Sequence, residues 1–126
     1  MFTNMGAYNQ IHFRAEFTIN EGKIEEFKKL IEDMSRLVEA NEPYTIGYQF
    51  YLNRAETKCV VHETYTNPEA VLAHNNSIAS QTVLPRIFAV SRITKFDVYG
   101  NPNQELERLL TSFSPQIYNL FAGFSR

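Results

Sequence analysis

Hydrophobic residues recur with two different periods along this chain, and the order of these periods restricts the possible folds. Residues 10–19 alternate between apolar and polar, as in a strand with one buried face. Residues 23–40 carry apolar side chains at spacings of three and four, as in an amphipathic helix. Alternation returns at 44–52 and 58–66, on either side of a predicted hairpin turn. The chain therefore begins strand, helix, strand, strand.

A second helical region and a fourth strand complete this order. Asn67 can cap a helix that begins at Pro68, because proline fits the first helical position. Another helical stretch around Pro85 leads to a predicted strand at 93–99, which ends before Gly100. The resulting order, βαββαβ, is that of the ferredoxin-like fold, an α+β fold whose four-stranded antiparallel sheet carries helices on one face.

The C-terminal part of the chain extends beyond this pattern. Residues 105–113 place leucines and a phenylalanine on one stripe, which predicts a helix. A second short helix is expected from Ser114 and Pro115, with Ile117, Tyr118, Phe121 and Phe124 as its apolar side. Both segments are amphipathic, so we expect them to dock on the rest of the protein as extra C-terminal helices.

The chain of 126 residues has the size of one domain, and we expect 1–126 to form one. Its core would span about residues 10–100 and its helical extension residues 101–126. The hydrophobic fraction of 44% and the charged fraction of 21% are typical of an ordered globular protein. The net charge of −2 gives no electrostatic reason to expect binding to nucleic acid or to an anionic membrane.

Several features predict a cytoplasmic location. No segment is long and apolar enough to span a bilayer. Residues 1–10 lack the basic region and the apolar stretch of a signal peptide. The single cysteine, Cys59, lies in an apolar strand-like run, where we expect a small buried side chain and not a reactive thiol.

One face of the predicted sheet lacks a cover within the chain. The helices of this fold lie on one face only, yet the other face also carries aromatic and aliphatic side chains. Because a second copy of the chain is the simplest cover, we predict a homodimer.

The stretch from His62 to His74 resembles the signature of the antibiotic biosynthesis monooxygenase family. In that family a strand ends in a glutamate, an aromatic residue and a turn follow, and a short helix has an alanine near its start and a histidine near its end. Those places are taken here by Glu63, Tyr65, Ala70 and His74. Two further segments, Glu21–Phe27 and Asp97–Tyr99, resemble the first helix and the last strand of the family. The resemblance covers about residues 10–100.

The resemblance implies a dimeric α/β barrel and an oxygen-using activity on quinol-like or polycyclic phenolic substrates, without metal or flavin. Relatives of the same fold include isomerases, haem-degrading enzymes and proteins without known activity, so the fold alone does not define the reaction. Many family members have a tryptophan where Tyr65 stands, and this chain contains none, which argues against haem degradation. A second His-Phe pair, frequent after the helical histidine, is replaced here by residues 77–81.

His74 and Glu63 are the candidate catalytic residues. His74 shares a helix face with Ala70 and Val71, so it should point inward, where imidazole can act as acid or base. Its alternative is a histidine satisfied by a backbone carbonyl or a carboxylate. Glu63 shares its strand face with Val61 and Tyr65; burial would raise its pKa, and it could orient His74. Its alternative is a salt bridge to a helix or to the dimer partner.

Tyr48, Tyr51 and Tyr65 are candidates to line a substrate pocket and to donate hydrogen bonds, with core or interface packing as the alternative. The histidines and the cysteine show no metal-ligand spacing, and no phosphate-binding loop is present, so neither a metal nor another cofactor is predicted. We therefore predict a cofactor-independent monooxygenase acting on a quinol-like or phenolic small molecule. The alternatives are a non-catalytic dimer that binds a small aromatic molecule and an isomerase of the same fold.

Overall fold

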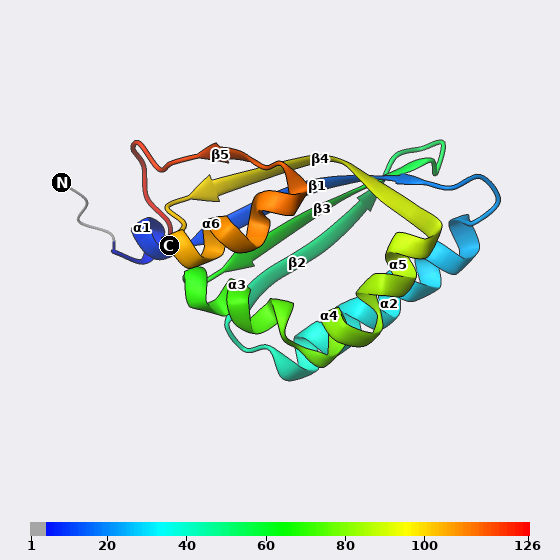
Figure 1. Ribbon diagram of the computed structural model, residues 1–126, viewed down its shortest axis with the longest axis horizontal. Coiled ribbons are helices and arrows are strands. Elements are labelled where there is room, and N and C mark those ends of the chain that lie inside the picture. Colours follow the sequence, from blue (N-terminus) through cyan, green and yellow to red (C-terminus); the bar gives the residue numbers. More distant parts are fainter. Residues whose placement is uncertain (1–4) are drawn as a thin grey trace.

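A single five-stranded sheet organises the computed structural model, which describes residues 5–126 (Figure 1). Its strands are β1 (Ile11–Ile19), β2 (Thr45–Leu52), β3 (Lys58–Tyr65), β4 (Ser91–Gly100) and β5 (Gln116–Tyr118). The spatial order is β2-β3-β1-β4-β5, and the first four pair antiparallel. The predicted ferredoxin-like core is therefore confirmed.

Helices cover one face of this sheet (Figure 1). The bounds of the helices are α1 (Met5–Asn9), α2 (Ile24–Asn41), α3 (Pro68–Asn75), α4 (Ile78–Thr82), α5 (Leu84–Val90) and α6 (Gln104–Leu110), which continues into the 3₁₀ turn η1 (Thr111–Phe113). The second helical region of the predicted fold is thus three short helices, α3, α4 and α5.

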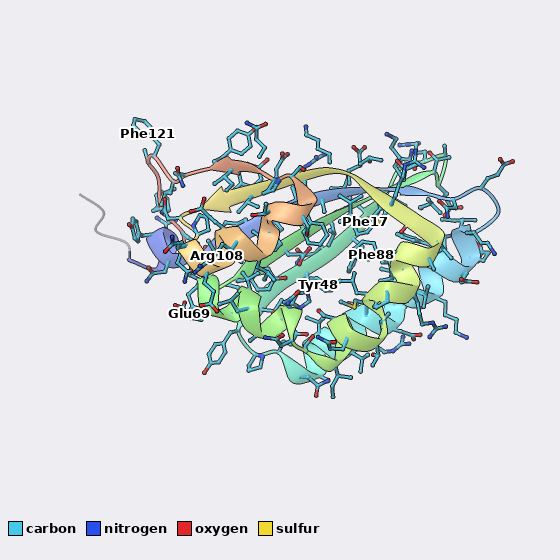
Figure 2. The ribbon with its side chains drawn as sticks, viewed as in Figure 1. Phe17, Tyr48, Glu69, Phe88, Arg108 and Phe121 are labelled. Carbon is cyan, nitrogen blue, oxygen red and sulfur yellow. The ribbon has the colours of Figure 1, made fainter. Side chains whose placement is uncertain are left out.

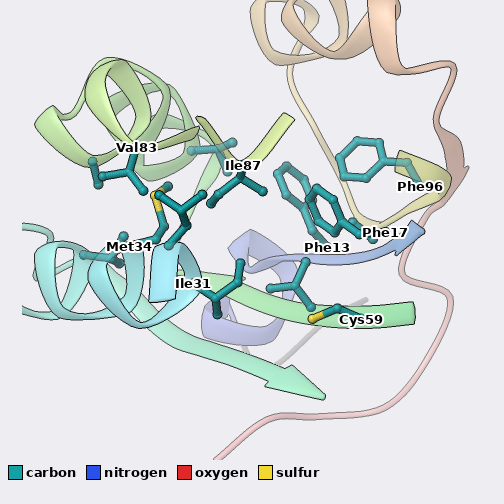
Figure 3. Close-up of a cluster of buried hydrophobic side chains, with 14 of the residues drawn as sticks. Phe13, Phe17, Ile31, Met34, Cys59, Val83, Ile87 and Phe96 are labelled. Atoms are coloured by element: carbon teal, nitrogen blue, oxygen red, sulfur yellow. The ribbon is translucent and has the colours of Figure 1, made fainter. Parts of the chain in front are cut away.

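The core lies between the helices and the sheet. Every second side chain of β1 is buried, from Ile11 to Ile19, as the alternation predicts. The apolar stripe of α2, from Phe27 to Val38, packs against this layer. Figure 3 shows part of the cluster, in which Cys59 is buried as expected. Burial of each large side chain of this kind contributes on the order of 1.5–3 kcal/mol.

The second C-terminal helix expected from Ser114 does not form. Ser114 adopts a left-handed backbone conformation with φ of 50°, which ends η1. The chain then continues as β5, which pairs in parallel with the outer edge of β4 and places Tyr118 beside Tyr99. An exposed strand edge has unpaired backbone groups, so pairing with β4 satisfies groups that an isolated short helix would leave free. The expected four-stranded antiparallel sheet is therefore a mixed sheet of five strands.

Residues 1–4 lie outside the described part of the chain, so the prediction that residues 1–10 are not a signal peptide falls partly outside it. Among residues 5–126, no helix has both the length and the apolar character to cross a membrane.

Candidate active site

Helix α3 positions His74. The helix starts sharply because the side chain of Asn67 accepts a hydrogen bond of 2.9 Å from the backbone N–H of Ala70, and Pro68 fits the first turn. His74 follows in the last turn, with its side chain only 11% exposed. Ser80 donates a hydrogen bond of 2.6 Å to the carbonyl of His74, which ties the end of α3 to α4. The imidazole therefore points into the layer between helices and sheet.

Glu63 lies on β3 and points into the same layer. Its side chain is 12% exposed, and the hydroxyl of Tyr65 donates a hydrogen bond to its Oε1 atom. Burial raises the pKa of Glu63, while the nearby His74 and the Tyr65 hydrogen bond lower it in part. Glu63 therefore holds a proton more readily than an exposed glutamate does, and it is a stronger base when ionised.

His74 lies between two carboxylates. Its Nδ1 atom is 2.6 Å from Oε1 of Glu42, and its Nε2 atom is 3.8 Å from Oε1 of Glu63. Burial by itself would lower the pKa of His74, but the hydrogen bond to Glu42 and the charges of both glutamates outweigh it, so the pKa is raised. The imidazolium form is stabilised inside the protein.

Glu42 is the site residue that the sequence did not reveal. It lies in the turn between α2 and β2, in the sequence Asn41-Glu42-Pro43, whose proline indicates the end of a helix and nothing more. Thr45 donates a second hydrogen bond, of 3.1 Å, to the same Oε1 atom that His74 contacts. No local pattern relates this turn to a histidine far along the chain, because the contact arises only when α3 packs beside the start of β2.

A cavity of about 90 Å³ opens beside these groups. Six phenylalanines form much of its wall: Phe13, Phe17, Phe50, Phe88, Phe96 and Phe113. Its polar end holds Tyr48, Glu63 and His74. Figure 2 places Phe17, Phe88 and Tyr48 between the sheet and the helices. No lysine or arginine is among the described residues that line it, so the cavity suits an uncharged, largely apolar molecule with one group at the acidic end.

The three candidate tyrosines have different surroundings. Tyr48 lines the cavity, with its ring centroid 5.7 Å from that of His74. Tyr65 is fully buried, 5.6 Å from the His74 ring, and contacts Glu63 without lining the cavity. Tyr51 lies on the opposite face of the sheet, 53% exposed and beside the ring of His62. The structure therefore brings His74, Glu63, Tyr48 and Tyr65 together and leaves Tyr51 outside.

The arrangement of two carboxylates around one imidazole is suited to moving protons. His74 can pass a proton to, or accept one from, a carboxylate beside it. Burial also raises the pKa of Tyr48 and Tyr65 well above the ordinary tyrosine value, with the charge of Glu63 adding to the effect, so both stay protonated donors. Within the described residues, no group of three or more His, Cys, Asp or Glu side chains is arranged to hold a metal ion.

Solved structures resemble this chain closely in fold. MupZ from Pseudomonas fluorescens superposes with a TM-score of 0.77 and 27% sequence identity, over 94% of this chain and 95% of MupZ. SnoaB, a cofactor-independent oxygenase from Streptomyces nogalater, has a TM-score of 0.65 and 14% identity, over 76% of this chain and 96% of SnoaB. A conserved protein from Methanosarcina mazei has a TM-score of 0.66 and 15% identity, over 77% and 97% of the two chains.

A comparison with curated proteins gave no match. The sequence model of one family, described as antibiotic biosynthesis monooxygenase, matches residues 11–85, which is more than half of the chain. This match includes β1, α2, β2, β3 and α3, and with them His74 and both glutamates. The chain therefore belongs to the antibiotic biosynthesis monooxygenase family.

Proposed function

We propose that this protein is a cofactor-independent monooxygenase that acts on a quinol-like or phenolic small molecule. The observation that carries the proposal is the buried Glu63–His74 pair at the polar end of a cavity walled by phenylalanines. Membership of the monooxygenase family supports an oxygenase. SnoaB, which has the same fold, is described as a cofactor-independent oxygenase.

In this proposal, the Glu63–His74 pair removes a proton from the substrate hydroxyl. The resulting phenolate gives up an electron to O₂ far more readily than the neutral phenol does. The substrate thus loses its hydroxyl hydrogen and the one hydrogen of the reacting ring carbon, and that carbon gains one oxygen atom as a carbonyl. The other oxygen atom leaves as water with those two hydrogens. The substrate supplies all four electrons that O₂ accepts, so no separate reductant is consumed.

The environment of the pair supports both halves of this chemistry. Glu63, with its raised pKa, is the stronger base for a buried hydroxyl, and protonated His74 beside it stabilises the negative charge that develops. The tyrosine hydroxyls of Tyr48 and Tyr65 add neutral donors at the same end of the cavity. The phenylalanine wall gives apolar space to the substrate rings and to O₂.

Oxygen uptake with a panel of quinols and phenols tests the proposal. We expect wild-type protein to consume O₂ with at least one of them, and the His74→Gln and Glu63→Gln variants to lose about 100-fold or more in rate. The matched control is Glu39→Gln, an exposed glutamate on α2 away from the cavity. If the wild type consumes no O₂ with any member, while panel members still raise its melting temperature, the protein is a binding protein and not an oxygenase.

We also propose that two copies of the chain pair through the sheet face opposite the helices. That face carries Tyr51 and Tyr99, which are 53% and 36% exposed, together with the half-buried Val60. Pairing would remove these apolar groups from water and give the sheet a cover on both faces.

A further inference from the structure

His74 lines two separate hollows. The cavity described above contains Glu63 and lies between the helices and the sheet. A second hollow, here called the outer groove, contains Glu42 and is lined by residues 41–45 together with parts of α3 and α4, including Ala73. Among the described residues, His74 is the one that lines both. Its imidazole therefore forms part of the wall between cavity and outer groove.

Glu42 lines the outer groove, and one of its two carboxylate oxygens has no hydrogen-bond partner among the described residues. Its side chain is only 8% exposed. Its Oε1 atom receives hydrogen bonds from His74 and Thr45. Its Oε2 atom is buried and has no hydrogen-bond partner within residues 5–126. Buried polar atoms are nearly always paired, so an unpaired carboxylate oxygen beside a groove calls for a water or another small partner there.

We propose that Glu42 is a positioning residue that holds His74 through Nδ1 and exchanges the proton of the ring with solvent at the outer groove. With Nδ1 bound to Glu42, the Nε2 atom faces Glu63 and the cavity. His74 also belongs to the proposed function. The role of Glu42, however, requires only that Glu42 binds Nδ1 and that solvent in the outer groove can exchange the proton of the ring.

The exchange is a simple proton transfer. The Nδ1–H bond breaks as a proton binds Oε1 of Glu42, the electron pair stays on nitrogen, and the carboxyl group then releases a proton to water in the groove. In the reverse direction, a proton from water binds Glu42 and passes to Nδ1, which restores the positive charge of the ring. Once a ligand fills the cavity, water cannot reach the pair from that side. The groove then keeps the protonation of His74 in equilibrium with solvent.

The titratable groups around His74 come from three elements. Glu42 lies in the turn after α2, Tyr48 on β2, and Glu63 and Tyr65 on β3. The two tyrosines stay neutral, so the charge that His74 meets comes from the two glutamates. Removal of the charge of Glu42 should therefore lower the pKa of His74, and the loss of its acceptor should release the Nδ1–H tautomer.

NMR titration of the His74 ring, with ¹⁵N-labelled histidine, measures both properties without any substrate. We expect Glu42→Gln to lower the pKa of His74 and Glu42→Asp to restore part of the shift. Glu39→Gln removes the same charge from an exposed site on α2 and should leave the titration unchanged. An unchanged pKa and tautomer of His74 in the Glu42→Gln variant would overturn the proposal. Because glutamine has nearly the same shape as glutamate, this variant can still be measured if the more disruptive Glu42→Ala does not fold.

Formate then tests the route. In Glu42→Ala, formate should enter the outer groove, take the place of the missing carboxylate and raise the pKa of His74 again. Addition of Ala73→Leu, which narrows the groove, should increase the formate concentration required by about tenfold. Addition of Leu109→Phe, which narrows the cavity instead, should not. If formate does not raise the pKa of His74, exchange through the groove is contradicted. The same holds if Leu109→Phe, and not Ala73→Leu, increases the formate concentration required.

These outcomes are separate from those of the oxygen-uptake experiment. Absence of oxygen uptake would overturn the proposed function and leave the titration of His74 intact. If the pKa and tautomer of His74 do not change in Glu42→Gln, the proposed role of Glu42 is wrong, and the result for oxygen uptake still stands.

Discussion

At the scale of single residues, the candidate site combines side chains that are placed by their own helix or strand with Glu42, which is placed by a contact between distant segments. The capped start of α3 places His74 inward, and the alternation of β3 places Glu63 on the buried face, so both could be predicted from local pattern. Glu42 could not, because its role depends on a turn packing against a helix that follows two strands later. Tyr51 was grouped with Tyr48 by residue type, although strand alternation places them on opposite faces.

The stability of the protein should depend on pH through His74. The folded protein binds the proton of His74 more tightly than the unfolded chain, because the folded pKa is raised above 6.5. This contribution to the free energy of unfolding is fully present below pH 6.5 and is lost as the pH rises through the folded pKa. We expect the melting temperature of wild type to exceed that of His74→Gln by more at about pH 6 than at about pH 9. A difference that grows with pH would contradict this.

Tyr65 should act on Glu63 through its hydroxyl. The hydrogen bond from Tyr65 lowers the pKa of Glu63, in opposition to the effect of burial. Tyr65→Phe removes only the donor, so the pKa of Glu63 should rise further, as measured by carbon NMR of its carboxyl group. Tyr51→Phe makes the same change on the opposite sheet face and serves as the control. A Glu63 pKa that stays constant or falls in Tyr65→Phe would refute the role of this hydrogen bond.

At the scale of elements, strong periodicity predicted β1 and α2 well, whereas irregular backbone escaped prediction. β2 changes register between Thr45 and Gly47, so Ile46 does not continue the buried face of Tyr48 and Phe50 and is 52% exposed. The segment after Ser114 has apolar residues at spacings that fit a helix, but the free edge of β4 captures it as a strand. After Ser114, tertiary hydrogen bonding to β4 outweighed the local pattern.

The C-terminal extension is part of the core and of the site. Leu106 is fully buried, and Leu109, Leu110 and Phe113 line the cavity. The match to MupZ covers 94% of this chain, so it must include most of the C-terminal extension. The match to SnoaB covers only 76% of this chain. The extension is thus a structural feature that this chain has in common with MupZ.

Leu106→Ala should therefore destabilise the whole protein. Deletion of a fully buried leucine side chain in this way typically costs about 2–5 kcal/mol. Phe121→Ala, in the same extension but 94% exposed, should change the free energy of unfolding by less than about 0.5 kcal/mol. Urea denaturation of the two variants checks this. Equal, small effects would mean that the extension only rests on the surface.

At the scale of the whole molecule, the order of the helical and strand periodicities was enough to predict the four-stranded core of the fold. Six segments in the order strand, helix, strand, strand, helix, strand leave few compact arrangements, so the four-stranded core could be derived without any knowledge of contacts. The cavity could not be derived in this way, because its volume depends on how α5, α6 and η1 meet the sheet.

The proposed dimer makes a prediction at this scale. Val60 lies on β3, on the sheet face opposite the helices, so Val60→Glu should place a charge in the proposed interface and dissociate the dimer. Ile78→Glu makes the same kind of change on the helical layer, at a residue that is 65% exposed, and should leave the dimer intact. Sedimentation equilibrium at micromolar concentration measures both. A wild-type monomer under these conditions would refute the dimer.

In the proposed function, a substrate hydroxyl loses its proton at the acidic end of the cavity. A crystal structure of the protein with a bound phenol or quinol, prepared without oxygen, tests this most directly. We predict that the ligand rings fill the phenylalanine-lined cavity and that the hydroxyl lies within about 3.2 Å of Glu63 or of Nε2 of His74. A ligand bound elsewhere, or one whose hydroxyl points away from both residues, would contradict the account.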